Sequence, residues 1–136
     1  MEFQFDLTRE DIIKYRIERA FETIEEAKIL ANANRWNATV NRLYYASFYA
    51  VIGLFAQRRI RTKTHSGALN MFSKEFIKTG IVSQKLGDLY STLFNKRQES
   101  DYKDLQVFTK EDIEHLIPET EEFIKTIKQI IDKSVI

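Results

Sequence analysis

Residues 43–56 read LYYASFYAVIGLFA and form the most apolar stretch of the chain. Wound as a helix, this stretch has apolar side chains nearly all round, which is typical of a helix that packs on more than one side. It is too short to cross a bilayer, and tyrosines and a glycine interrupt it. We therefore expect a buried central helix over residues 35–58, no membrane span, and a homodimer that covers the surplus apolar face.

The rest of the chain also has helical periodicity, with only 4 glycines and 1 proline to interrupt it. Thr8, Thr64 and Thr109 fit helix N-caps, and the first and last of these have an aspartate three residues later. Pro118 predicts a kink or a fresh start in the last helix. The pattern predicts an all-α protein with helices near residues 8–33, 35–58, 64–79, 83–100 and 109–133, and a loop over 101–108.

The composition indicates the number of domains, the cell compartment and the distribution of charge that we expect. A chain of 136 residues with 43% hydrophobic content suits one core, so we expect a single domain over residues 1–136. The absence of cysteine and of a basic, apolar leader favours a cytoplasmic protein. Basic residues nearly balance acidic ones, 21 against 20, but no acid lies between Arg58 and His65. We therefore expect a local cationic lobe there.

The first candidate site lies on the central helix. Arg42, Tyr45 and Tyr49 share one face across about two turns, because an α-helix turns by about 100° per residue. A guanidinium and two phenols in one stripe suit a phosphate and a stacked base. The alternative is that the tyrosines are core or interface aromatics and that Arg42 pairs with an acid.

The second candidate site is the segment RTKTHSG at residues 61–67. Arg61 and Lys63 precede a helix start, where an anion is favoured, and His65 can titrate near neutral pH. The alternative is structural: Thr64 caps the helix, and His65 bonds across to another helix. His115, the second histidine, is expected to be a solvated surface residue.

The third candidate is the pair Arg97 and Asp101, which lie one helical turn apart. They can brace a neighbouring side chain of a site, or simply form an ion pair at a helix end.

Other kinds of site have little support in the sequence. There are no thiolates, no HExxH motif and no glycine-rich phosphate loop, so we expect no metal site and no cofactor. Ser66 adjoins His65, but neighbouring residues on a helix point apart, which argues against a serine nucleophile.

Several segments in order resemble the HEPN family, in particular its small stand-alone prokaryotic members. They are RLYYASFYA at 42–50, KTHSGALNMF at 63–72, KTG at 78–80 and RQESDY at 97–102. The resemblance implies an antiparallel bundle of about five helices with an up-and-down four-helix core. It also implies a homodimer packed through the central helices and pairing with a minimal nucleotidyltransferase as a toxin and antitoxin couple.

The resemblance also implies a chemistry. Active HEPN ribonucleases carry an arginine and, after four to six intervening residues, a histidine, and they cleave RNA without metal. Arg42 matches the arginine, but Tyr49 stands where close relatives have the histidine. A phenol with an ordinary pKa of about 10 is a weak base at neutral pH. The prediction is slow cleavage or none, unless the fold brings His65 beside Arg42.

The leading hypothesis is therefore a HEPN-type protein that binds RNA or a nucleotide, a toxin-like partner of a minimal nucleotidyltransferase and possible metal-independent endoribonuclease. The alternative is a non-catalytic dimerisation or scaffold module that docks a nucleotidyltransferase through its aromatic stripe. The predicted catalytic residues are Arg42, Tyr49 and His65, and the predicted binding residues are Arg42, Tyr45, Arg61, Lys63, Arg97 and Asp101.

Overall fold

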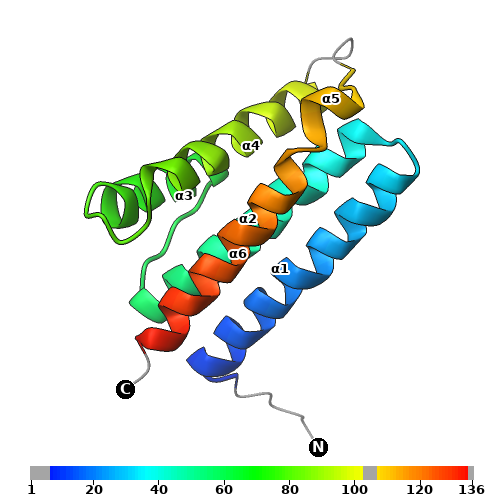
Figure 1. Cartoon of the computed structure of the whole chain (residues 1–136). Coiled ribbons are helices and arrows are strands. Elements are labelled where there is room, and N and C mark those ends of the chain that lie inside the picture. Colours follow the sequence, from blue (N-terminus) through cyan, green and yellow to red (C-terminus); the bar gives the residue numbers. More distant parts are fainter. Residues whose placement is uncertain (1–6, 103–106, 135–136) are drawn as a thin grey trace, which may run out of the picture.

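The computed structural model describes residues 7–102 and 107–134, and in these ranges it contains helices and no strand. Helices α1 and α2 lie side by side, α6 packs across both, and α3 and α4 lie on the other side of α2 (Figure 1). The helices are α1 (Arg9–Asn32), α2 (Trp36–Arg58), α3 (His65–Phe72), α4 (Gln84–Tyr102), α5 (Lys110–Ile113) and α6 (Leu116–Lys133), with a π-helical turn η1 (Ser73–Ile77) after α3. The all-α prediction is confirmed.

Helices α1, α3 and α5 begin where polar side chains satisfy their first backbone N–H groups. The Thr8 hydroxyl accepts from the Asp11 amide at 3.1 Å, and the Asp11 carboxylate accepts from the Thr8 amide at 3.1 Å. Thr109 and Asp112 form the same reciprocal box at the start of α5. Thr64 caps α3 by accepting from the Gly67 amide at 2.9 Å. The predicted caps are therefore confirmed, and each stabilises its helix by roughly 1 kcal/mol.

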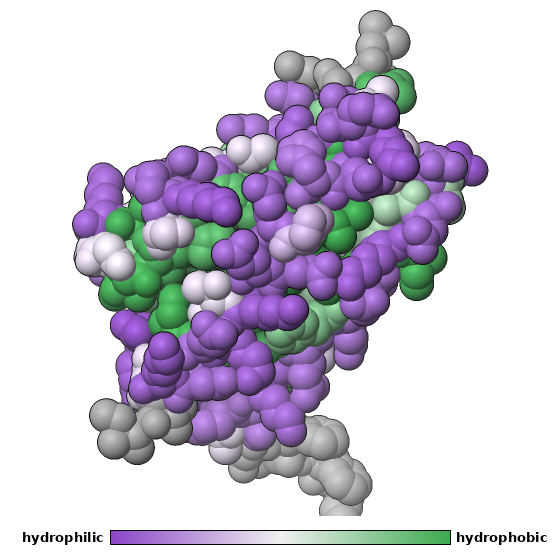
Figure 2. Space-filling model, viewed as in Figure 1, coloured by the Kyte–Doolittle hydropathy of each residue, from purple (hydrophilic) through white to green (hydrophobic). Residues whose placement is uncertain are grey.

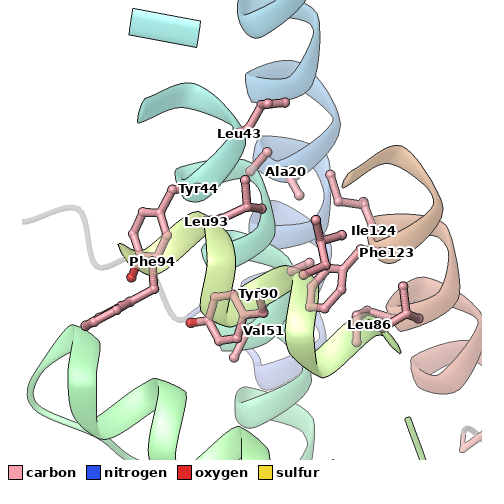
Figure 3. Close-up of a cluster of buried hydrophobic side chains, with 14 of the residues drawn as sticks. Ala20, Leu43, Tyr44, Val51, Leu86, Tyr90, Leu93, Phe94, Phe123 and Ile124 are labelled. Carbon is pink, nitrogen blue, oxygen red and sulfur yellow. The ribbon is translucent and has the colours of Figure 1, made fainter. Parts of the chain in front are cut away.

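Helix α2 is the centre of the core, as its sequence predicts. It contacts α1, α3, α4, α5 and α6, so it has neighbours on several sides. Tyr44 and Leu43 are fully buried. The Tyr90 ring of α4 stacks on Tyr44 at 6.2 Å and contacts Phe123 of α6 at 5.8 Å (Figure 3). The buried apolar residues of all the helices join in one cluster.

One predicted boundary is wrong. Helix α4 continues through Tyr102, so the predicted loop over 101–108 begins too early, and residues 103–106 of that loop lie outside the described residues. The fresh start that Pro118 predicts in the last helix is confirmed, because a turn at Glu114 and His115 precedes α6. Pro118 is the third residue of α6, a position in the first turn where a proline removes no helical hydrogen bond.

The connector after α2 decides where the candidate site forms. Arg59 ends the helix in the left-handed conformation, with φ of 59°, and its amide bonds back to the helix. The chain then reverses and runs back beside α2 to the start of α3 (Figure 1). This reversal carries His65 to the middle of the central helix.

The outer surface is mostly polar. In the view of Figure 2, hydrophilic residues cover most of α1 and α6, and hydrophobic residues gather toward α3 and η1. His115 is exposed, as predicted. Among the described residues, no helix combines the length and the apolarity that crossing a membrane requires.

Candidate functional site

His65 packs against three aromatic rings of α2, those of Tyr44, Tyr45 and Phe48. Its Nδ1 atom is 2.8 Å from the Tyr44 hydroxyl, a hydrogen bond that joins α3 to the central helix. The imidazole also packs on Phe48, with ring centres 4.5 Å apart, and meets the Tyr45 ring edge-on at 5.7 Å. With Nδ1 engaged by Tyr44, Nε2 is the ring nitrogen left for a ligand.

Arg42 reaches the same group of rings. Its guanidinium carbon lies 5.1 Å from the centre of the Tyr45 ring. The Arg42 Nε and Nη2 atoms donate to the Asn41 side-chain oxygen at 3.1 and 2.9 Å, and Nη1 lies 3.8 Å from the Glu26 carboxylate. These partners hold the guanidinium over the ring while leaving N–H groups for an anion.

Arg97 of α4 completes the arrangement. Its guanidinium carbon lies 5.2 Å from the Tyr44 ring centre and 5.3 Å from that of Tyr45. Its Nε donates to the Asp101 carboxylate at 3.0 Å, and the Arg97 side chain is only 11% exposed. Asp101 therefore fixes Arg97 against the rings. We call Arg42, Tyr44, Tyr45, Phe48, His65 and Arg97 the aromatic cluster.

Tyr45 is the residue that connects the cluster. The cations of Arg42 and Arg97 and the ring of His65 all contact its ring. The fold thus brings His65 to the same ring as Arg42, although 23 positions separate them in the sequence. One ring with two guanidiniums and an imidazole around it suits a phosphodiester: cations for the charge and a titratable nitrogen for a proton.

Tyr49 lies at the edge of the cluster. The centre of its ring lies 6.2 Å from that of Tyr45, and the guanidinium carbon of Arg19 in α1 lies 5.2 Å from the centre of the Tyr49 ring. No ring contact joins Tyr49 to His65 in the described structure, and Tyr45 and Phe48 are their shared neighbours. Tyr49 and His65 therefore occupy different sides of the site.

Burial and charge set the protonation of the cluster. Burial lowers the pKa of His65 below its ordinary value of 6.5, and the positive charge of Arg97 lowers it further. Burial also raises the pKa of Tyr44 to about 12, against the opposing effect of Arg97. At neutral pH the cluster therefore holds a neutral imidazole hydrogen-bonded to a neutral phenol.

Arg61 and Lys63 lie outside the aromatic cluster. They line a cavity of about 490 Å³ between the connector, α1 and α2, which Phe48 and His65 also line. The cavity therefore adjoins the cluster at His65. Of the predicted site residues, Arg42, Tyr45, His65, Arg97 and Asp101 come together, Tyr49 lies beside them, and Arg61 and Lys63 face the adjoining cavity.

The sequence reasoning missed the residues that support the cluster. Tyr44 was read only as part of an apolar run, yet a buried tyrosine needs a partner for its hydroxyl, and His65 supplies it. Arg19 and Glu26 of α1 are not among the predicted site residues, and their ion pair at 3.9 Å borders the site. A cationic residue within an acidic helix was the available signal.

Comparison with known proteins agrees with this geometry. The model of the HEPN domain matches residues 13–130. A Thermotoga maritima protein named "UPF0332 protein" is 38% identical over 91% of this chain and 94% of its own length. A Methanocaldococcus jannaschii protein named "Putative toxin MJ0142" is 36% identical over 88% of this chain and 82% of its own. A second protein of that organism, "Putative toxin MJ0605", is 32% identical over 88% of each chain. The family match covers nearly all the described helices and every residue of the aromatic cluster, and the chain belongs to the HEPN domain family.

Proposed function

We propose that this protein is a toxin-type HEPN protein that binds RNA and cleaves it at the aromatic cluster without metal. One observation carries the proposal: Arg42, Arg97 and His65 all contact the Tyr45 ring. The arginine of the family motif and a histidine thus contact the same ring, although Tyr49 occupies the usual histidine position. The names of the archaeal relatives support the toxin assignment.

His65 is the proton acceptor in this proposal. In the tautomer with its proton on Nδ1, the imidazole donates to the Tyr44 oxygen and leaves Nε2 free to accept the proton of an RNA 2′-hydroxyl. The 2′-oxygen then bonds to phosphorus as the bond to the 5′-oxygen breaks, and water protonates the leaving oxygen. The lowered pKa of His65 keeps Nε2 available as a base at neutral pH.

The two arginines stabilise the phosphate. The guanidinium carbons of Arg42 and Arg97 lie 5.1 and 5.3 Å from the Tyr45 ring centre, and each guanidinium has further N–H groups that can bond to a phosphate beside Tyr45. Because Asn41 and Asp101 hold them in place, little reorganisation is needed as charge develops on the phosphate oxygens.

We further propose that the protein is a cytoplasmic homodimer that pairs with a minimal nucleotidyltransferase as its antitoxin. The family resemblance supports the dimer, and the toxin names of the relatives support an antitoxin partner. Light scattering at micromolar concentration should give twice the mass of the chain. A monomer would contradict the dimer and leave the cleavage proposal unaffected.

The experiment is incubation of the purified protein with labelled RNA in EDTA. Wild type should bind and cleave, and Arg42→Ala should bind more weakly by about 1.5 to 3 kcal/mol, because a charge-assisted bond to phosphate is lost. Arg35→Ala is the matched control, since Arg35 is an exposed arginine just before α2. Equal binding and cleavage by wild type and Arg42→Ala would contradict the site. Binding without cleavage would support the scaffold alternative.

A further inference from the structure

A second cavity continues the one that Arg61 and Lys63 line. The two cavities, about 490 and 450 Å³, share Arg16, Phe55, Ile60 and Arg61, so they form one depression beside the connector. We call this depression the cationic trough. It begins at His65 and extends to the start of α1, and its basic residues are Arg9, Arg16, Arg59, Arg61 and Lys63.

No acidic residue lines the trough within the described structure. The other described cavities differ in this respect. The groove between α1 and α6 has Glu10, Glu18 and Asp132 beside its lysines, and the two remaining cavities also include glutamates. In a chain with a net charge of only +1, a depression lined by five cations and no acid is a concentrated positive field.

The cations of the trough are available to a ligand. Arg9, Arg59, Arg61 and Lys63 are exposed, and no side-chain ion pair with residues 7–102 or 107–134 engages them. Arg16 is half-buried and donates through Nη1 to the Ile52 carbonyl at 2.9 Å, which fixes it in the wall. These cations therefore contribute little to holding the fold together.

The walls between the cations are apolar. Phe48, Ile52, Phe55 and Ile60 lie among the lining residues. Proteins that bind single strands of nucleic acid place the phosphates on cations and the bases against apolar side chains. An acidic peptide could also bind to the cations. The trough, however, opens at His65, where the phosphodiester that is cleaved must lie, and this favours a strand of RNA.

We propose that the cationic trough binds several consecutive nucleotides of single-stranded RNA and leads the strand to the aromatic cluster. This inference rests on the proposed function and specifies its substrate as a strand rather than a mononucleotide. Phosphate contacts position the strand, and the cluster acts on one phosphodiester of it.

The test measures binding of labelled 2′-O-methyl oligoadenylates, which resist 2′-hydroxyl cleavage. Wild type should bind a decanucleotide at least about tenfold more tightly than a dinucleotide, because more phosphates meet cations. The variant Arg9→Gln/Arg61→Gln/Lys63→Gln should lose this preference. Its slope of log affinity against log salt should be smaller by about 2, since each cation contributes roughly 0.7 on a single strand.

The control removes the same charge from another surface. Lys85, Lys110 and Lys125 are exposed and do not line the trough, so Lys85→Gln/Lys110→Gln/Lys125→Gln should bind like wild type. Circular dichroism should show that both triple variants are folded.

Three results would overturn the trough. They are wild-type affinity in the trough variant, equal losses in the two triple variants, and equal affinity of wild type for the dinucleotide and the decanucleotide. If the trough variant binds normally while Arg42→Ala binds weakly, only the trough proposal fails. If neither change affects binding, the proposed function fails as well.

Discussion

The aromatic cluster and the cationic trough meet at His65 but hold their cations in opposite ways. In the cluster, Arg42 and Arg97 lie on tyrosine rings and bond to Asn41 and Asp101. In the trough, most of the cations are exposed and form no ion pair with any residue that the structure describes. The cluster fixes each charge at one place, whereas the trough leaves its charges adaptable.

This difference separates two tasks in one site. Transition-state stabilisation needs groups that are held in position before the reaction, because reorganisation during the reaction costs free energy. Strand binding needs charge and reach more than a fixed geometry, since a nucleic acid backbone is flexible and any phosphate suffices. The account therefore predicts that loss of His65 reduces the rate of cleavage and that changes in the trough reduce affinity. Loss of Arg42, which contacts the phosphate, should reduce both.

The largest effect is expected for His65→Ala. If His65 accepts the proton of the 2′-hydroxyl, its loss should lower the single-turnover rate by about 10²- to 10⁴-fold. RNA affinity should change by less than about threefold, because the trough still holds the strand. His115→Ala removes the exposed second histidine and should leave the rate unchanged. A His65→Ala variant that cleaves at the wild-type rate would remove the cluster from the chemistry.

The next effect concerns stability and compares two adjacent tyrosines. Tyr44→Phe removes the hydroxyl that bonds to His65 inside the core, so the free energy of unfolding should fall by about 1 to 3 kcal/mol. Tyr45→Phe removes a hydroxyl from a half-buried ring and should cost less than about 0.5 kcal/mol. Urea titrations measure both values. Equal losses would show that the bond between Tyr44 and His65 contributes nothing to the fold.

The pH dependence follows from the lowered pKa of His65. Because the folded state disfavours the charged imidazole, the unfolded state binds more protons near pH 6.5, and His65 contributes stability that is lost as the pH falls below that value. His65→Gln should remove this part of the pH dependence. The acid limb of the cleavage rate should likewise lie below pH 6.5, and Arg97→Gln should move it upward. An acid limb above pH 6.5 in wild type would exclude His65 as the base.

The smallest effect is expected at Arg59, which lies in the trough with a positive φ. The left-handed conformation costs a non-glycine residue about 1 kcal/mol, so Arg59→Gly should stabilise the fold by roughly 0.5 kcal/mol after the entropy of glycine is included. The same change removes a trough cation and should weaken decanucleotide binding about threefold. Stability and affinity should thus move in opposite directions. A loss of both would show that Arg59 supports the fold.

Much of the fold was predictable because its signals are local. Thr8, Thr64 and Thr109 begin helices by bonding to amides three residues away, so the sequence alone contains both partners. The ends of helices were harder to predict. Helix α4 runs two residues past its predicted end at 100, a difference of the size by which helix ends commonly vary. The break at Glu114 and His115 agrees with a local signal, because Pro118 fits the first turn of a new helix.

The site was predictable only in part, for the same reason. The spacing of Arg42, Tyr45 and Tyr49 on one helix already placed them together. The meeting of His65 and Tyr45 depends on the reversal of the chain after Arg59, a tertiary feature. The cationic lobe predicted between Arg58 and His65 contains Arg59, Arg61 and Lys63 of the trough. Arg9 and Arg16 come from α1, so their part in the trough depends on the fold.

The most direct test of the central claim is mass spectrometry of the products from one RNA and from the same RNA with a single 2′-deoxynucleotide at the cut position, both digested in EDTA. The account predicts that wild type leaves a 2′,3′-cyclic phosphate on the 5′ fragment, because the 2′-oxygen attacks phosphorus. The single deoxynucleotide should abolish that cut, and His65→Ala should give no product from either RNA. Cleavage at the deoxynucleotide, or a 3′-hydroxyl product that forms only when a divalent metal is restored, would contradict the account.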